Sequence, residues 1–435
     1  GSAPKYYEVI LGRKVKKDLK KGTPVNWALI EGKKNWGDTF FKMVEKYDAG
    51  PVYAQEYFQI LESDSCKTVY DILKTNDLCN YYSIEDRPGI SFKTKNTKRY
   101  DFLDDEAIVE KWIKLALKII IPRGITNIHD AWQDPTTVKV LQQLSESGKL
   151  PIRIYGMLGS SHPKLLKHFF KEGIFRSEKY NIRSVKAFID GALGSRGAAL
   201  LEPYCDDLNN CGLILISDKD FIKLAQKCQN AGFQLCTHAI GDRGNKMVLD
   251  IYSEFTKELN NHRWRIEHAQ MICDEDISRF AKAGIVPSMQ PSHCTSDMPW
   301  LHDRLGSNRL HRISRWQSFI DAGCKIPGGS DCPIEEGNPI FEYYAAVTRK
   351  NHNGTPNDGW QKQEAVSRID ALKMFTTWAA YGEFAEHRRG KIRPGFDADL
   401  TFLNQDITEC PEKEILKTEV LGTMVAGEFI FNKLN

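Results

Sequence analysis

Hydrophobic positions become regular after about residue 105, where helical and strand-like patterns begin to alternate. Residues 107–121 are apolar at helical spacing, and Pro122 and Gly124 end that pattern. Short apolar runs that end in polar residues then recur at residues 125–128, 151–158, 184–190, 233–238, 264–268, 285–290 and 324–331. Strands that alternate with helices form βαβ units, so these seven runs predict a parallel sheet.

The first hundred residues lack this regularity. They contain pairs of aromatic residues without a clean period, and residues 52–60 are the most strand-like stretch. Six basic residues and one acidic residue fall between residues 13 and 21. This run favours a solvated helix face, and a site for an anionic surface is the weaker alternative.

Composition narrows the class of protein. The chain has 435 residues, of which 41% are hydrophobic and 27% charged, as in an ordinary globular protein. At roughly 150 residues per domain this length allows about three domains, although barrels often exceed that size as one domain. The net charge of +3 argues against nucleic acid as the main partner. No apolar run approaches the roughly 20 residues that span a bilayer, so we expect no membrane segment.

Cysteine usage indicates a reducing compartment. The 11 cysteines are an odd number and are scattered, with no CxxC pair, so neither a disulfide framework nor a structural zinc site is expected. The N-terminal residues lack the order of charged, apolar and small residues found in secretory signals. We therefore expect a cytoplasmic location.

Polar residues at the ends of four predicted strands are the candidate functional residues. They are Lys186, His238, His268 and Asp331. In a (β/α)8 barrel, functional side chains lie at the carboxyl ends of the strands, where residues from separate strands converge. Taken singly, a histidine could be structural, the lysine could form an ion pair and Gly-Ser-Asp could be a turn. Together, imidazoles and a carboxylate favour a divalent metal such as zinc.

Several motifs resemble one known family. They are residues 184–200 (SVKAFIDGALGSRGAAL), 237–245 (THAIGDRGN), 265–270 (RIEHAQ), 287–300 (PSMQPSHCTSDMPW) and 329–333 (GSDCP). In this order they resemble the amidohydrolase superfamily, and within it amidohydrolase family 3, the YtcJ-like metal-dependent hydrolases that include N-substituted formamide deformylases. Residues 390–400 (GKIRPGFDADL) and 423–427 (TMVAG) resemble the return of those chains into a small β-sandwich.

The resemblance implies a TIM-like α/β fold, a (β/α)8 barrel with a small β-sandwich domain. Barrel strands 2–8 would lie in residues 106–388, and the C-terminal part of the sandwich in residues 389–435. Residues 1–105 are unassigned and resemble the insertion between barrel strands 1 and 2. Strand 1 and the N-terminal part of the sandwich are not recognisable in this sequence.

The resemblance also implies roles for the strand-end residues. Lys186 would become a carbamate that bridges two metal ions, and His238 and His268 would bind the more exposed ion. Asp331 would bind the other ion and take a proton from the attacking hydroxide. His293 would polarise a substrate carbonyl, with a structural hydrogen bond as an equal alternative. Other matched residues would orient the ligands and loops or line the substrate pocket: Asp190, Arg196, Asp242, Arg243, Asp297 and Trp300.

The expected function is hydrolysis of amide-type, non-peptide C–N bonds by metal-activated hydroxide. The cofactor would be one or two divalent ions, with zinc first, and the partner a small amide-type substrate whose identity the sequence does not reveal. A homodimer is the commonest oligomer and is the default expectation.

One departure from the family leaves three hypotheses open. Family members carry His-x-His at the end of strand 1, whereas the first of the 11 histidines here is His129, in the segment that resembles strand 2. The chain could be a truncated form of an active hydrolase. It could instead be an inactive member that binds a ligand or partner. Finally, another segment could replace strand 1 and leave a one-metal site at Lys186, His238 and His268.

Overall fold

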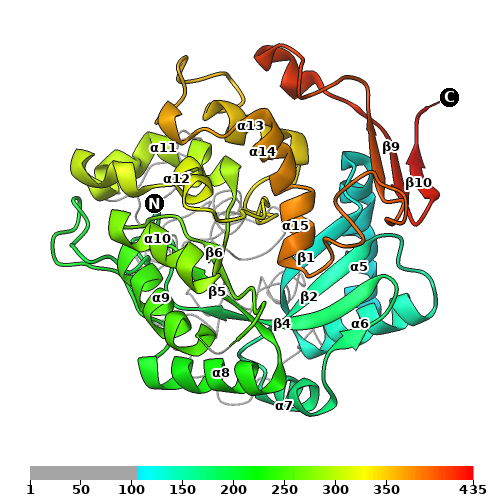
Figure 1. Ribbon diagram of the computed structural model, residues 1–435, viewed down its shortest axis with the longest axis horizontal. Coiled ribbons are helices and arrows are strands. Elements are labelled where there is room, and N and C mark those ends of the chain that lie inside the picture. Colours follow the sequence, from blue (N-terminus) through cyan, green and yellow to red (C-terminus); the bar gives the residue numbers. More distant parts are fainter. Residues whose placement is uncertain (1–104, 258, 435) are drawn as a thin grey trace, which may run out of the picture. The chain divides into compact units, whose positions relative to one another are not determined.

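A curved, mostly parallel sheet with helices outside it is the main element of the fold (Figure 1). The computed structural model describes residues 105–257 and 259–434, and the predictions for residues 1–104, including the strand-like stretch at residues 52–60, lie outside them. The strand order is β1 (Asn127–Gln133), β2 (Arg153–Gly159), β4 (Tyr180–Phe188), β5 (Gln234–Ala239), β6 (Arg265–His268) and β7 (Val286–Ser288). The short β3 (Phe175–Arg176) pairs antiparallel with β4.

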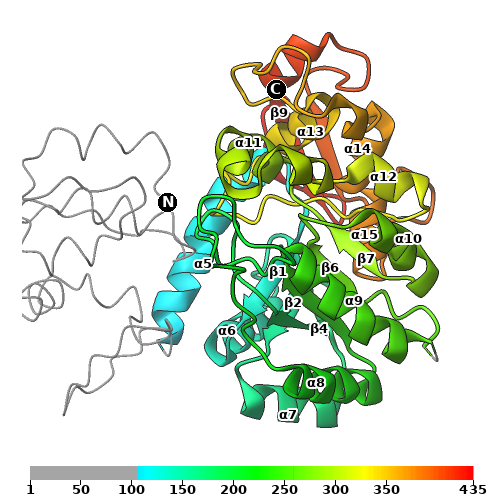
Figure 2. The same ribbon diagram turned by 90° about the vertical axis from the view of Figure 1, so that its left-hand side faces the viewer.

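Helices follow most of these strands and cover the outer face of the sheet. Figure 2 shows α6 to α9 around β1, β2, β4 and β6. The helices are α5 (Glu106–Ile120), α6 (Pro135–Glu146), α7 (Pro163–Glu172), α8 (Asp218–Ala231), α9 (Asp242–Thr256), α10 (Asp274–Ala283), α11 (Pro291–Leu305), α12 (Trp316–Asp321), α13 (Pro339–Thr348), α14 (Arg368–Met374) and α15 (Thr377–Gly382), with short 3-10 turns η5 (Ile121–Arg123), η6 (Ser307–Arg312), η7 (Lys362–Glu364) and η8 (Glu412–Lys417).

Local sequence explains where these elements begin and end. The Asp134 side chain accepts hydrogen bonds from the backbone of Thr136 and Thr137 and so caps α6, which has proline in its first turn. Gly232 adopts a left-handed conformation after α8, where a residue without Cβ is favoured. β2 and β5 are buried at every position, as expected of parallel strands covered on both faces.

The TIM-like α/β fold is confirmed, and six of the seven predicted strands are present. The prediction of a seventh strand at residues 324–331 is wrong. This segment forms only an isolated parallel bridge, in which Gly328 pairs with Met289. Pro327 has no N–H to donate, and the N–H of Gly328 donates to the Met374 carbonyl of α14 instead of to a strand. Within the described residues β1 pairs only with β2, so the sheet is an open half-barrel.

A second, antiparallel sheet of three strands follows the last helices. It consists of β8 (Leu400–Leu403), β9 (Val420–Val425) and β10 (Glu428–Asn432), with β9 in the middle. These strands lie within residues 389–435, where the sequence predicted part of a small β-sandwich; the domain boundaries themselves stay predictions. None of the helices in the described part of the chain is long and apolar enough to cross a membrane.

Arg153, at the start of β2, joins the two sheets. Its Nε donates to Asp399 Oδ2 at 2.6 Å, its Nη2 donates to Asp399 Oδ1 at 3.0 Å, and its Nη1 donates to the Glu178 carbonyl at 2.8 Å. Asp399 immediately precedes β8, and the Arg153 side chain is almost completely buried. This forked ion pair therefore links the parallel sheet to the antiparallel sheet.

Buried charges occupy the inner side of the half-barrel. Arg265 of β6 donates through Nη2 to Glu267 Oε2 at 3.0 Å and to Ser288 Oγ at 2.8 Å, and its Nη1 lies 2.9 Å from His129 Nδ1. Lys186 is buried in the same region. Burial would raise the pKa of Glu267, but the charges of Arg265 and Lys186 outweigh it and lower that pKa to about 2. Glu267 is therefore ionised at neutral pH and balances buried cations.

We expect Arg153→Met to lower the free energy of unfolding by about 3–5 kcal/mol, because it leaves the carboxylate of Asp399 without its buried partner. Urea denaturation measures this change. Arg388→Met is the matched control, because Arg388 pairs with Asp397 from a side chain that is 55% exposed, and its loss should cost less than about 1 kcal/mol. Equal losses in the two variants would contradict the linking role of Arg153.

Glu267 predicts a specific pH dependence of stability. The pKa of Glu267 falls from an ordinary 4.5 to about 2 on folding. Its contribution to the free energy of unfolding is therefore fully present above pH 4.5 and is lost as the pH falls from 4.5 towards 2. Glu267→Gln should lower stability at neutral pH by a few kcal/mol, on the order of its pKa shift, and should flatten the profile in that window. Glu254→Gln, at an exposed site, should leave the profile unchanged. If the unfolding free energy of Glu267→Gln changed with pH between 4.5 and 2 as steeply as that of the natural chain, Glu267 would not be the source of this pH dependence.

Candidate functional site

The register of three neighbouring strands places the predicted residues at one edge of the sheet. Lys186 of β4 lies opposite Cys236 of β5, and two residues further on Phe188 lies opposite His238. His268 ends β6 opposite Ala239. Because the strands are parallel, their carboxyl ends meet at this edge, as the sequence predicted.

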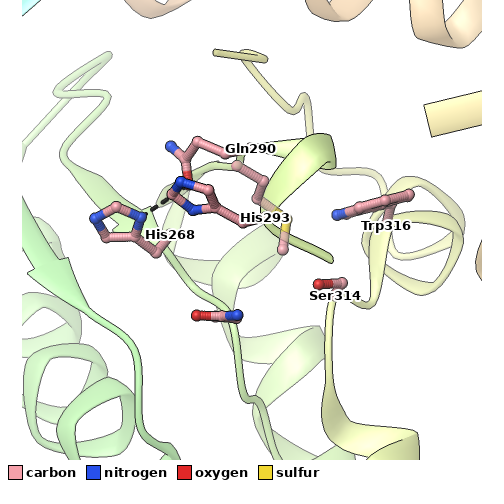
Figure 3. A pocket seen from close by; sticks show the side chains of 7 residues that line it. His268, Gln290, His293, Ser314 and Trp316 are labelled. Atoms are coloured by element: carbon pink, nitrogen blue, oxygen red, sulfur yellow. Dashed lines mark hydrogen bonds between the residues drawn. The ribbon is translucent and has the colours of Figure 1, made fainter. Parts of the chain in front are cut away.

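Three side chains at this edge could hold one metal ion. One ligand atom each from His268, His293 and Asp331 lies within 4.8 Å of the other two. His268 is buried, His293 is partly buried and Asp331 is exposed. The His268 and His293 rings are nearly parallel, with centroids 5.8 Å apart (Figure 3). The structure thus brings together two of the four residues expected as ligands and adds His293.

The backbone is unusual at these ligands. His268 has φ of 74°, Ala269 has 41° and Asp331 has 52°. Residues with a side chain rarely adopt positive φ, and such strain tends to occur at functional sites. The chain therefore keeps two candidate ligands in conformations that cost energy.

Gln290 fixes the orientation of His268. The Nδ1 of His268 lies 2.8 Å from Gln290 Oε1, and both side chains line the same small pocket (Figure 3). An amide oxygen only accepts hydrogen bonds, so Nδ1 carries the proton and Nε2 keeps its lone pair. A partner of this kind on the far ring nitrogen is typical of a metal-binding histidine.

His293 has a buried nitrogen available for a ligand. Its Nε2 has no hydrogen-bond partner within the described residues. Burial would lower the pKa of His293, but Asp331 first, and then Glu335 and Asp297, outweigh it and raise that pKa. Nearby, the carboxylate of Glu342 accepts the Ser292 N–H at 2.8 Å, which fixes the first turn of α11.

His238 and Lys186 lie beside this group with different partners. The Nε2 of His238 is 3.4 Å from the Gly191 carbonyl and 3.5 Å from Asp190 Oδ1. Its ring packs edge-on against His268 at 4.5 Å, and burial, followed by the charges of His268 and Lys186, lowers its pKa well below the usual range. Burial also lowers the pKa of Lys186, against the opposing charges of Glu267 and Asp331.

Asp190 organises the loops around the site. Its two carboxylate oxygens accept the backbone N–H groups of Ala199, Ile240 and Gly241 at 2.8–3.0 Å. Burial raises its pKa to about 7, although these hydrogen bonds act in the opposite direction. These contacts connect Asp190 with the loops after β4 and β5, and its role in orienting them for the site stays a prediction.

The other predicted loop residues also make structural contacts. Asp242 accepts the Leu201 N–H at 2.8 Å and pairs with Arg312 at 3.1 Å. Arg243 donates to the Cys211 carbonyl at 3.2 Å. These bonds tie the loop after β4 to the start of α9.

Arg196, Asp297 and Trp300 were also predicted to support the site or line its pocket. Arg196 pairs with Asp206 at 2.8 Å, and Asp297 accepts Gln270 Nε2 at 2.7 Å. Trp300 faces Gly194. Roles in substrate binding for these three residues stay predictions.

The pocket beside the candidate ligands includes residues that sequence reasoning missed. It is lined by His268, Gln270, Met289, Gln290, His293, Ser314 and Trp316. Figure 3 shows Ser314 and Trp316 across the pocket from His268. Gln290 lies inside the motif at residues 287–300, so its position in the sequence was a usable signal. Trp316 begins α12 and carried no signal in the sequence pattern.

Comparisons with known proteins agree with this architecture. A Bacillus subtilis amidohydrolase, YtcJ, is 29% identical over 330 residues, which cover 75% of this chain and 62% of that protein. An N-substituted formamide deformylase of Arthrobacter pascens is 25% identical over 70% of this chain and 57% of its own length. The chain thus spans about three fifths of these relatives. A metal-dependent hydrolase from Pyrococcus horikoshii has a similar fold, with a TM-score of 0.63 and 24% identity over 85% of this chain and 70% of that one.

Two family models match the chain. Residues 21–82 match the formyl transferase family, which gives part of the N-terminal region a resemblance of its own. The view of residues 1–105 as an insertion between two barrel strands stays a prediction. The amidohydrolase family model matches residues 89–431, which is well over half of the chain. On this match and on the shared fold, the chain belongs to the amidohydrolase family.

Proposed function

We propose that this protein is a metal-dependent hydrolase that cleaves the C–N bond of a small, amide-type, non-peptide substrate. The observation that carries this proposal is the group of His268, His293 and Asp331 at the carboxyl edge of the sheet. Membership of the amidohydrolase family supports the reaction class. The related N-substituted formamide deformylase suggests formamides as the first substrates to examine.

The side chains at this edge fit a divalent ion such as zinc. Two imidazoles and a carboxylate are a ligand set that zinc accepts, and the buried Nε2 of His293 lacks a partner among the described side chains. A metal bound here would polarise the substrate carbonyl and make water more acidic. His268 and Asp331 belong to both the ligand set implied by family resemblance and the group formed in the structure.

Asp331 is the proposed general base. Although Asp331 is exposed as a residue, its carboxyl group lies among protein groups, and this burial would raise its pKa. The charges of His268, His293 and Lys186 outweigh that effect and lower the pKa, so the carboxylate is ionised at neutral pH. It can accept a proton from the attacking water and then donate it to the nitrogen that leaves when the C–N bond breaks. The proton acquired in the first step is thus returned in the second.

The pocket walls fit a small substrate with both polar and apolar parts. Met289 and Trp316 offer apolar surface, and Gln270 and Ser314 offer hydrogen-bonding groups. We propose that Gln270 or Ser314 orients the amide group while the apolar side chains contact its substituent. A cytoplasmic location and a homodimer remain predictions from the sequence.

We expect the zinc-loaded chain to hydrolyse an N-substituted formamide or a cyclic amide, and Asp331→Asn to lower kcat at least about 100-fold through loss of the general base. Release of the amine product measures the rate. Removal of metal with a chelator should abolish the activity, and added zinc should restore it. Asp358→Asn, at an exposed position, is the matched control and should retain full activity. Metal binding without hydrolysis of either substrate class would instead favour a ligand-binding member of the family.

A further inference from the structure

A row of aromatic rings continues from the candidate site along the carboxyl edge of the sheet. The centroid of the His268 ring lies 4.5 Å from that of His238, and the centroid of His238 lies 5.0 Å from that of Phe188. The Trp132 ring lies 5.2 Å from Phe188, and the His162 ring lies 6.1 Å from Trp132. The row therefore runs from β6 across β5 and β4 to β1 and to the loop after β2.

We propose that Trp132, His162 and Phe188 form a binding surface for a flat, aromatic group of the substrate, and we call these three residues the aromatic surface. This inference rests on the proposed function and specifies its substrate class, an amide that carries an aryl group. The pocket beside the candidate ligands lies towards β6 and β7, whereas the aromatic surface lies towards β4 and β1. The reacting amide group then lies between the two.

Phe188 ends β4 on the same face of the strand as Lys186, because side chains two residues apart share a face. The Nζ of Lys186 lies 5.0 Å from the centroid of the Phe188 ring. The four residues of β4 before Phe188 are buried, but Phe188 itself is 37% exposed. Its ring is therefore accessible to a ligand that approaches the candidate site.

An irregularity in β1 directs Trp132 towards Phe188. The residues on either side of Trp132 pair with consecutive residues of β2, Met157 and Leu158, so Trp132 is an extra residue, as in a β-bulge. Its φ of 113° is one that residues with a side chain rarely adopt. Bulges are over-represented next to active sites, where they redirect a side chain, and strained backbone also concentrates there.

Gly159, at the end of β2, leaves room for the Trp132 ring. β2 lies between β1 and β4 in the sheet, so the Trp132 side chain has to cross the end of β2 to contact Phe188. A Cβ on Gly159 would lie 2.8 Å from Trp132 Cε2 and 3.0 Å from His162 Cδ2. Two rings of the aromatic surface thus pack against backbone that only glycine leaves uncovered.

The aromatic surface differs from the aromatic pairs of the core. Tyr252 and Trp264 lie 4.9 Å apart and are both almost completely buried. In contrast, Phe188 is exposed and both Trp132 and His162 are partly exposed. Core packing does not require rings that remain in contact with solvent, whereas such rings can pair with an aromatic ligand in offset or edge-to-face geometry.

The test compares two formamides with the same carbon skeleton, N-(2-phenylethyl)formamide and N-(2-cyclohexylethyl)formamide, of which only the first has a flat ring. We expect the zinc-loaded natural chain to have a KM for the phenyl compound that is lower by about 3-fold or more, because aromatic pairs add to the energy of area burial. Dissociation constants from isothermal titration calorimetry give the same comparison without turnover.

Four variants assign that preference to the aromatic surface. Trp132→Leu and Phe188→Leu should abolish the preference in both KM and Kd and should change kcat by less than about 2-fold, because neither ring contacts the bond that breaks. Trp132→Phe keeps a ring and should retain the preference. Phe429→Leu removes a 43% exposed ring from β10 and is the matched control, with an unchanged preference.

The outcomes separate this inference from the proposed function. Equal constants for the two formamides in the natural chain, or an unchanged preference in folded Trp132→Leu and Phe188→Leu, overturn the aromatic surface, while the hydrolase proposal stands if either compound is hydrolysed. A preference in Kd that both leucine variants lose, without any hydrolysis, supports the aromatic surface and contradicts the proposed activity. Circular dichroism checks folding, and if neither leucine variant folds, the preference of the natural chain decides the question.

Discussion

The parallel register of β4, β5 and β6 is the constraint on which the candidate site depends. It sets Phe188 opposite His238 and Ala239 opposite His268, so that the ends of three strands meet at one edge. Side chains alternate between the faces of a strand, and a slip of one residue would turn each of these groups to the opposite face. The helices α8 and α9 pack against β5, and the chemistry of the site follows from the strand register.

The buried charges inside the half-barrel connect the stability of the fold to the state of the site. Arg265 keeps Glu267 ionised, and Glu267 in turn lies near Lys186, whose charge helps to lower the pKa of Asp331. Burial keeps His238 neutral despite its position among these groups. A substitution at Glu267 would therefore alter both the unfolding free energy and the electrostatic field at the candidate base.

Much of this arrangement could be predicted from local pattern, and the exceptions have physical causes. Alternating apolar runs located six strands, and the polar end of one of them identified His268, whereas Asp331 was identified at the end of the seventh run, which is not a strand. The sequence predicted a strand at residues 324–331 because Cys324 and Ile326 are apolar, but Pro327 and the glycines that follow it do not form a continuous row of backbone hydrogen bonds with a neighbouring strand. Trp316 was not predicted as a pocket residue, because its place in the pocket comes from long-range packing. The periodicity of apolar residues along the chain does not encode such packing. The presence of His293, in the first turn of α11, instead of His238 of β5 in the converging group likewise depends on side-chain direction, which apolar periodicity does not encode.

The proposed ligands all come from the later part of the chain, and this bears on the His-x-His pair that the given sequence lacks. His268, His293 and Asp331 all follow the start of β6, and Gln290 and Glu342, which support them, also lie in the later part of the chain. β1, β2 and β4 then act as the scaffold that positions β5 and β6. With the proposed ligand set, the earlier strands contribute shape and buried charge to the site. The lack of a histidine pair is therefore compatible with metal-dependent chemistry at this edge of the sheet.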